Sequence, residues 1–166
     1  CFFFFFAVFL EIKGLEKVVS GYIGGKTINP TYKDICTGET GHAEAIQITF
    51  NPNEVAYEDL LEVFFATHDL TTLNRQGADV GTQYRSEIFY HSEAQKTKAE
   101  NYIQLLEKEK LYDKKIVTKV SSASVFYNAE EYHQNYYNQN SSQGYCQMVI
   151  APKLEKLRKY YKSKLK

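Results

Sequence analysis

The sequence predicts an α+β domain, a two-layer sandwich of helices on a mixed, mainly antiparallel sheet. Three observations support this fold class. The chain has 166 residues, which suits one domain with a core of its own. Its composition, 43% apolar and 24% charged, is that of a globular rather than a disordered protein. The expected helices and strands follow one another without a regular βα alternation, which argues against a doubly wound sheet.

The first half of the chain contains four expected elements. Apolar residues within 4–13 favour the start of a helix, and the apolar run 18–23 favours a strand. Residues 42–50 alternate with a period of two, which is typical of a strand with one buried face. The apolar spacing over 54–68 predicts an amphipathic helix.

The second half repeats this mixture of short elements. We expect strands at 87–90, 116–120 and 123–126, and helices at 92–110, 129–138 and 153–163. Two long loops, 24–41 and 69–84, interrupt the pattern, and a loop of that length in a compact domain is usually functional. Residues 139–152 are rich in small and polar residues, so we expect a mobile loop there.

The charge pattern excludes some classes of partner. Twenty basic and twenty acidic residues cancel, which argues against a protein that binds nucleic acid over its whole surface. Residues 153–166 are basic, and a solvated C-terminal helix explains them better than a membrane anchor. No apolar run approaches the roughly 20 residues of a membrane span. The first ten residues lack the basic flank of a signal peptide, and with no initiator Met we expect the chain to begin inside a longer gene product.

Glu44 is the first candidate for chemistry. The alternation of residues 42–50 places it on one face with Ile46, Ile48 and Phe50. A carboxyl group on an apolar face is desolvated, which raises its pKa and favours the neutral acid. Such a group can donate a proton to a reacting atom. The alternative is a carboxylate at a strand end that pairs with Arg or Lys.

The cysteines are the second group of candidates. Cys1 precedes an expected helix, whose N-terminus would acidify its thiol. Cys146 lies in the small and polar segment near the C-terminus and could form a disulfide with a distant oxidised thiol. We interpret Cys36 as a loop thiol, and each of the three could also be an inert side chain. Three cysteines are too few for a disulfide framework, so a reducing cytoplasm is the expected location.

Two tyrosines in the long loops complete the candidate site. Tyr32 and Tyr84 could converge with Glu44 to form a polar pocket for a small dipolar group, although loop phenols are often only packed. The four histidines show no metal-ligand spacing, and no nucleotide-binding motif is present, so we expect neither a metal nor a cofactor. A cysteine hydrolase that uses Cys1 with His42 or His133 as base is a weaker alternative.

Five stretches together resemble the type A peptide methionine sulfoxide reductases, and they run through most of the chain. The stretches are VVSGYIGG, NPTYKDICTGETGHAEAIQITF, HDLTTLNRQGADVGTQYRS, ASVFYNAEEYHQNYY and GYCQMVIAPK. The combination of TGHAEA with NRQGADVGTQYRS is highly specific. The resemblance implies an α+β sandwich around a mixed sheet, a single catalytic domain over 1–166, and activity on methionine-(S)-sulfoxide without a bound cofactor.

The resemblance also implies roles for individual residues. Cys1 corresponds to the family's nucleophile and Glu44 to the acid that hydrogen-bonds the sulfoxide oxygen. Tyr32 and Tyr84 correspond to the phenols beside that acid, and Asp79 to a supporting carboxylate. The remaining assignments are Phe2 and Phe3 at the substrate's methyl group and Cys146, in the 139–152 loop, as the resolving cysteine.

Two positions depart from the family's first motif. Phe3 replaces a Trp and Phe6 replaces a Glu, so a member that binds oxidised methionine without turnover is the alternative function. The partners that the resemblance implies are thioredoxin as reductant and oxidised proteins or free methionine sulfoxide as substrate. A monomer without nucleic acid or membrane partners is expected.

Overall fold

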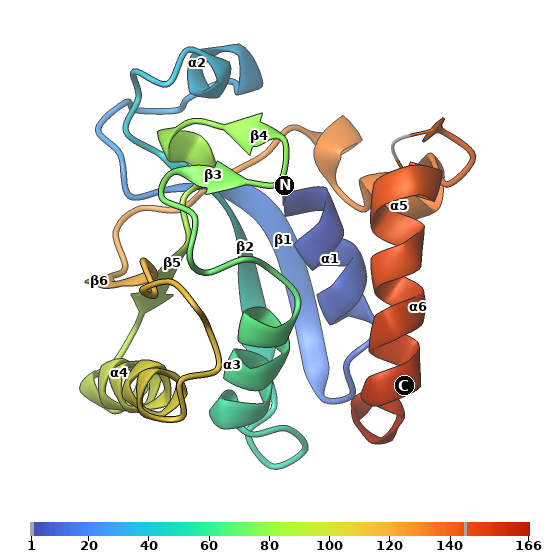
Figure 1. Cartoon of the computed structure of the whole chain (residues 1–166). Helices are drawn as coiled ribbons and strands as arrows, with labels where there is room; N and C mark the ends of the chain where they lie inside the picture. Colours follow the sequence, from blue (N-terminus) through green and yellow to red (C-terminus); the bar gives the residue numbers. More distant parts are fainter. Residues whose placement is uncertain (1, 145) are drawn as a thin grey trace.

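The computed structural model describes residues 2–144 and 146–166, and over them the chain is an α+β domain (Figure 1). The α-helices are α1 (Phe2–Leu10), α2 (Tyr32–Cys36), α3 (Tyr57–Ala66), α4 (Glu93–Lys108), α5 (Tyr136–Gln139) and α6 (Ala151–Tyr160). The strands are β1 (Leu15–Ile23), β2 (Ala43–Phe50), β3 (Arg75–Gln76), β4 (Asp79–Val80), β5 (Glu87–Tyr90), β6 (Lys119–Ser122) and β7 (Tyr127–Asn128). Short 3₁₀ turns occur at Thr82–Tyr84, Glu131–His133 and Lys162–Lys164.

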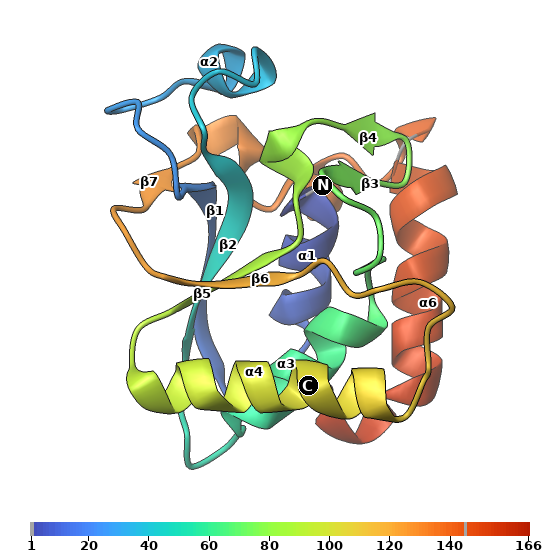
Figure 2. The same cartoon turned by 60° about the vertical axis from the view of Figure 1, so that its left-hand side comes forward.

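The described strands form three small sheets. One is antiparallel in the order β2-β1-β7, one is the antiparallel pair β3-β4, and one is the parallel pair β5-β6. The expected α+β class and the mainly antiparallel pairing are therefore confirmed, with the strands divided among three sheets. The long ladder between β1 and β2 is the frame of the domain, since it runs through the middle of the molecule (Figures 1 and 2).

The main core lies between the β1-β2 frame and helices α1, α3 and α6. Val8 and Phe9 of α1 meet Val63 of α3 and Leu154 of α6 there, and each of the four is 2% exposed or less. Helix α1 consists only of apolar residues and is buried on most of its surface, as such a helix must be. Figure 1 shows α1 and α6 side by side on one flank of β1 and β2.

A second core lies between α3, α4 and the β5-β6 pair. Leu61 and Phe65 of α3 pack there with Leu106 of α4 and with Ile116, which precedes β6. In Figure 2, α4 lies across the base of the molecule with β5 and β6 above it. The apolar stripe predicted over 54–68 thus serves both cores, because α3 stands between them.

Three expected boundaries are wrong. The strand expected at 123–126 is absent, and β7 forms just after it, where Tyr127 and Asn128 pair with β1. The helix expected at 129–138 is two short turns, because Asn135 between them adopts a left-handed φ of 52°. The segment 139–152 is not wholly a loop, since residues Cys146–Ile150 form a π-helical turn that continues into α6.

The basic C-terminal segment is occupied by contacts within the domain. Lys164 Nζ lies 2.6 Å from Asp59 and 2.7 Å from Glu62, and Arg158 pairs with Glu11. These ion pairs tie two of the segment's seven basic residues to the rest of the domain. In the described part of the chain, no helix is both long enough and apolar enough to cross a membrane.

Candidate active site

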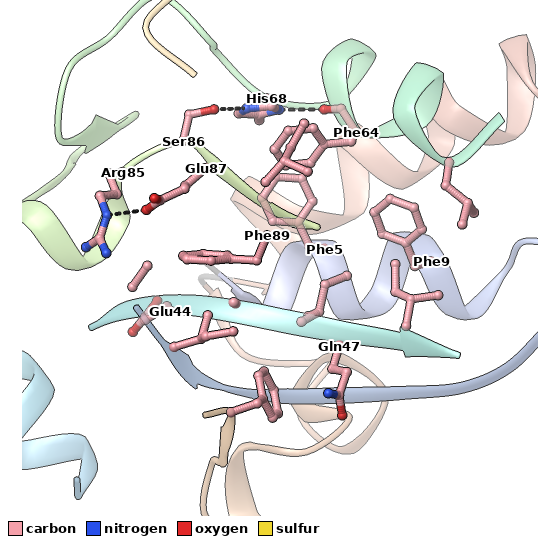
Figure 3. A pocket seen from close by; sticks show the side chains of 18 of the residues that line it. Phe5, Phe9, Glu44, Gln47, Phe64, His68, Arg85, Ser86, Glu87 and Phe89 are labelled. Carbon is pink, nitrogen blue, oxygen red and sulfur yellow. Dashed lines mark hydrogen bonds and ion pairs between the residues drawn. The ribbon is translucent and has the colours of Figure 1, made fainter. Parts of the chain in front are cut away.

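Glu44 lies at the start of β2, next to a cavity. It faces Tyr22 directly in the β1-β2 ladder, and opposite residues in such a ladder place their side chains on the same face. The Glu44 side chain is half-buried and lines a cavity of about 210 Å³ between β2, α3 and β5 (Figure 3). Ile46, Ile48 and Phe50 pack against the main core, so the apolar face predicted for this strand is present.

The two long loops meet beside Glu44. Arg85 follows the second loop, and its Nη2 donates to the carbonyl oxygen of Gly41, at the end of the first loop, over 3.0 Å. Its Nε pairs with Glu87 of β5 at 2.6 Å, a contact visible in Figure 3. One guanidinium therefore holds both loops at the start of β2. This contact explains why Tyr84, directly before Arg85, comes close to Glu44.

Tyr32 is placed by the first turn of α2. Thr31 caps this helix: its Oγ1 accepts from the Asp34 amide over 3.2 Å, and the Asp34 carboxylate accepts from the Thr31 amide over 2.9 Å. The Tyr32 amide donates to Glu130 over 3.0 Å, and its ring lies 4.5 Å from the ring of His133. The hydrogen bonds of the capping pair and of Glu130 thus hold the backbone that carries the Tyr32 phenol.

The electrostatics show that the phenols surround Glu44. Burial, and after it the charges of Glu44 and Asp79, together raise the pKa of Tyr84 to about 12. Burial also raises the pKa of Tyr32, together with a hydrogen bond to Cys36 and the charge of Glu44. Burial followed by the charges of Glu130 and Glu44 raises the pKa of Tyr22. All three phenols therefore keep their protons at neutral pH.

Two further groups border this cluster. Asp79 opens β4, and its charge is among the causes of the high pKa of Tyr84, which places its carboxylate near that phenol. Cys36 ends α2 one helical turn after Tyr32 and is exposed, with its thiol at the Tyr32 hydroxyl. The interpretation of Cys36 as a loop thiol is therefore wrong, because this residue ends a short helix. The Thr-x-x-Asp capping signal at 31–34 could have revealed the short helix that brings it to the site.

Several predicted site residues lie outside the described part. Cys1 precedes the first described residue, and the side chains of Phe2, Phe3 and Cys146 are not described. Helix α1 nevertheless begins at Phe2, directly after Cys1, so the expected helix at this position is present. The roles of these four residues remain predictions.

His42 and His133 bear on the alternative of a cysteine hydrolase. His42 is 2% exposed, accepts from the Gly25 amide over 2.9 Å and bonds the Thr27 carbonyl over 2.8 Å, so both ring nitrogens are used to hold the first loop. His133 Nε2 lies 3.3 Å from the Glu130 carboxylate. Within the described residues, no three His, Cys, Asp or Glu side chains are grouped so that they could hold a metal ion.

The fold is that of known methionine sulfoxide reductases. The structure matches Mxr1 from Saccharomyces cerevisiae in its reduced form with a TM-score of 0.79 and 34% identity, over 88% of this chain and 84% of that one. It matches methionine sulfoxide reductase A of Corynebacterium diphtheriae with a TM-score of 0.74 and 32% identity, over 85% and 71% of the two chains. The class of protein is therefore a sulfoxide-reducing oxidoreductase of α+β fold.

The sequence defines the family. A model of the family described as peptide methionine sulfoxide reductase matches residues 1–165. The peptide methionine sulfoxide reductase MsrA of Deinococcus radiodurans is 54% identical over the whole of this chain and 81% of its own length. The protein of the same name from Acinetobacter baumannii strain AYE is 55% identical over the whole of this chain and 94% of its own length. The chain belongs to the peptide methionine sulfoxide reductase family.

Proposed function

We propose that this chain reduces methionine-(S)-sulfoxide with Cys1 as the nucleophile and Glu44 as the acid. Family membership makes the chain an oxidoreductase that acts on methionine sulfoxide. What the proposal adds is the role of each residue. The observation that carries it is the meeting of Glu44 with the protonated phenols of Tyr32 and Tyr84, brought together from separate segments of the chain.

The site suits the charge that develops during sulfoxide reduction. The thiolate of Cys1 attacks the electrophilic sulfur, and the sulfoxide oxygen gains negative charge as that bond forms. Glu44 in its neutral form supplies a proton to this oxygen. The phenols of Tyr32 and Tyr84 hold it by donating hydrogen bonds, which are strongest when the oxygen is most negative. Asp79 lies near Tyr84 and supports its orientation. The protonated oxygen then passes from the substrate sulfur to the sulfur of Cys1, and the bond between the two sulfur atoms breaks. Methionine leaves as the reduced thioether, and Cys1 is oxidised to a sulfenic acid.

Phe2 and Phe3 form the other half of the proposed substrate site. They stand at the start of α1, directly after Cys1. Aromatic side chains there would hold the S-methyl group of the substrate by apolar contact. Phe3 fills this role in place of the Trp expected from the family pattern.

Recycling of the enzyme requires a second thiol. We assign this role to Cys146, whose thiol condenses with the sulfenic acid of Cys1 to give a disulfide and water. An external dithiol then reduces the disulfide, and thioredoxin is the proposed reductant. A monomer in the reducing cytoplasm fits this cycle, because thioredoxin must reach the disulfide and the three thiols must otherwise stay reduced.

The alternative of a binding module without turnover has no support from the similar proteins. The relatives at 54% and 55% identity, which this chain matches over its whole length, carry the name of the reductase. Phe3 and Phe6 therefore stand within a chain that matches these relatives over its whole length.

The test is reduction of the S epimer of methionine sulfoxide with dithiothreitol, with an ester as a control for hydrolysis. We expect methionine from the S epimer, and no release in Cys1→Ser. Ester hydrolysis, or undiminished reduction in Cys1→Ser, would contradict the proposal. Peptide mapping after one equivalent of substrate tests recycling: a Cys1–Cys146 link is expected, and an undiminished thioredoxin-driven rate in Cys146→Ser would overturn it.

A further inference from the structure

The buried side chain of Tyr22 is hydrogen-bonded to one carboxylate and stands opposite a second in the β1-β2 ladder. Tyr22 is 0% exposed, and its hydroxyl donates to Glu130 Oε2 over 3.2 Å. On its other side Tyr22 is the direct cross-strand partner of Glu44, and the charge of Glu44 acts on its phenol. A row of three groups, Glu130, Tyr22 and Glu44, therefore runs from the 129–134 segment to the proposed acid.

The segment that carries Glu130 is fastened to β1. The Gln134 side chain accepts from the Ser20 amide over 2.9 Å and donates to the Ser20 carbonyl over 2.9 Å, as a neighbouring strand would. The Ala129 amide donates to the same Ser20 carbonyl over 2.8 Å. Glu130 is held between these two anchors, so its position relative to Tyr22 is fixed by the backbone.

Glu130 also organises the neighbouring phenol. Its Oε1 accepts from the Tyr32 amide over 3.0 Å, while its Oε2 takes the Tyr22 hydroxyl. His133 lies 3.3 Å from the same Oε2 and packs its ring against Tyr32. One carboxylate thus determines the placement of two of the phenols near Glu44.

We propose that Glu130 and Tyr22 are positioning residues that keep Glu44 in its proton-bearing form, an inference that rests on the proposed acid role of Glu44. A phenol has a single hydrogen, and Tyr22 donates it to Glu130. Towards Glu44 its oxygen can then only accept. A neighbouring oxygen that can only accept favours the form of Glu44 that carries a proton and disfavours the ionised form.

The proposal predicts a defect that depends on pH. In Glu130→Gln the amide can donate to the Tyr22 oxygen, which frees the hydroxyl to donate to ionised Glu44, while the amide oxygen can still accept from the Tyr32 amide. The single-turnover rate should fall about tenfold above pH 7. The reason is that the Tyr22 hydroxyl then donates to Glu44 and stabilises its ionised form, which has no proton to supply. As the pH is lowered and a larger fraction of Glu44 carries its proton in the variant too, the rate should return towards that of the parent.

The other titratable groups near Glu44 must contribute equally to the pH profile of every variant that is compared. Among the described residues, these are the phenols of Tyr22, Tyr32, Tyr84 and Tyr132, the carboxylates of Asp79 and Glu130, the imidazole of His133 and the thiol of Cys36. The phenols of Tyr22, Tyr32 and Tyr84 have raised pKa values and keep their protons over the range used. All variants are therefore made in a Cys36→Ser background, and Cys1 is common to every comparison.

The experiment compares Glu130→Gln with Glu131→Gln, the exposed neighbour, which should keep the parent profile. Tyr22→Phe should lower kcat about tenfold with little change in KM, and adding Glu130→Gln to it should have no further effect.

A defect equal at all pH values, or an unchanged kcat in Tyr22→Phe, would overturn the proposal. The Tyr22→Phe result decides the question if Glu130→Gln does not fold. Normal Glu130→Gln behaviour beside an inactive Cys1→Ser and an impaired Glu44→Gln would refute this inference alone.

Discussion

The two ends of the cavity beside β2 differ in how their polar side chains are paired. At one end Glu44 meets phenols that belong to three separate segments. At the other end His68 bonds the Phe64 carbonyl through Nδ1 and the Ser86 hydroxyl through Nε2 at 2.7 Å (Figure 3). Ser86 in turn shares a 2.7 Å hydrogen bond with Thr118. The polar groups at the His68 end bond one another, whereas the Glu44 end is where we propose that the substrate oxygen binds.

This difference separates a structural polar group from a reactive one. Burial lowers the pKa of His68 to about 4, so the imidazole is neutral at physiological pH and both nitrogens are already bonded. A buried, fully paired group stabilises the fold and has little freedom to exchange protons. The phenols of Tyr32 and Tyr84, by contrast, carry hydrogens that we propose to be donated to a substrate oxygen. We therefore expect changes at His68 to affect stability and changes around Glu44 to affect rate.

The largest effect that we expect is a change in the free energy of unfolding with pH, caused by His68. The folded state holds His68 neutral with a pKa of about 4, whereas the unfolded chain protonates it near 6.5. The neutral His68 side chain therefore contributes fully to the free energy of unfolding above pH 6.5. As the pH falls from 6.5 to 4, the protein loses roughly 3 kcal/mol of this free energy. The pKa of His133 is also lowered by burial, so it acts in the same direction.

Urea unfolding of wild type and His68→Gln at pH 7 and pH 4 isolates the His68 contribution. The variant should be less stable at pH 7 and lose less stability on acidification, while its reductase rate at pH 7 stays within about threefold. His91→Gln, at an exposed histidine, is the control and should behave as wild type. Equal acid sensitivity in wild type and His68→Gln would show that His68 does not carry this contribution.

A smaller effect is expected at the phenols. Tyr32→Phe and Tyr84→Phe should each lower the single-turnover rate about tenfold, because each removes one donor to the developing negative oxygen. Tyr160→Phe, at a tyrosine that is 65% exposed, is the matched control. Rapid-quench measurement of methionine release gives the rates. If both site variants matched Tyr160→Phe, the phenols would have no part in the reaction.

The smallest effect is expected at Cys36. Its thiol lies at the Tyr32 hydroxyl, and Ser at this position can provide a similar partner. Cys36→Ser should therefore keep the rate within about threefold, both with dithiothreitol and with thioredoxin. A loss confined to the thioredoxin assay, together with a Cys1–Cys36 link in peptide maps, would instead make Cys36 the resolving thiol.

The Glu44 strand could be predicted because its information is local. Alternation over 42–50 identified both the strand and the face that Glu44 shares with Ile46, and the structure confirms both. The convergence of Tyr32 and Tyr84 followed from the family resemblance rather than from spacing. Their loops are joined through Arg85 and Gly41, a contact that no periodicity reveals.

Other features could not be predicted because they depend on distant segments. Tyr22 looked like part of an ordinary apolar strand, and its partner Glu130 lies 108 residues away. The boundaries near 123–138 failed for a related reason. There the chain is held by Gln134 bonding to Ser20 and turns at Asn135, so tertiary contacts override local propensity.

One measurement tests the central claim most directly: the single-turnover rate of S-epimer reduction in Glu44→Gln beside Gln47→Ala. Gln47 lies on the same strand and lines the same cavity but is exposed. Gln at position 44 can still donate a hydrogen bond but cannot deliver a proton. We expect a loss of about 10²-fold or more in Glu44→Gln and a rate close to wild type in Gln47→Ala. Equal rates in the two variants would contradict the assignment of Glu44 as the acid.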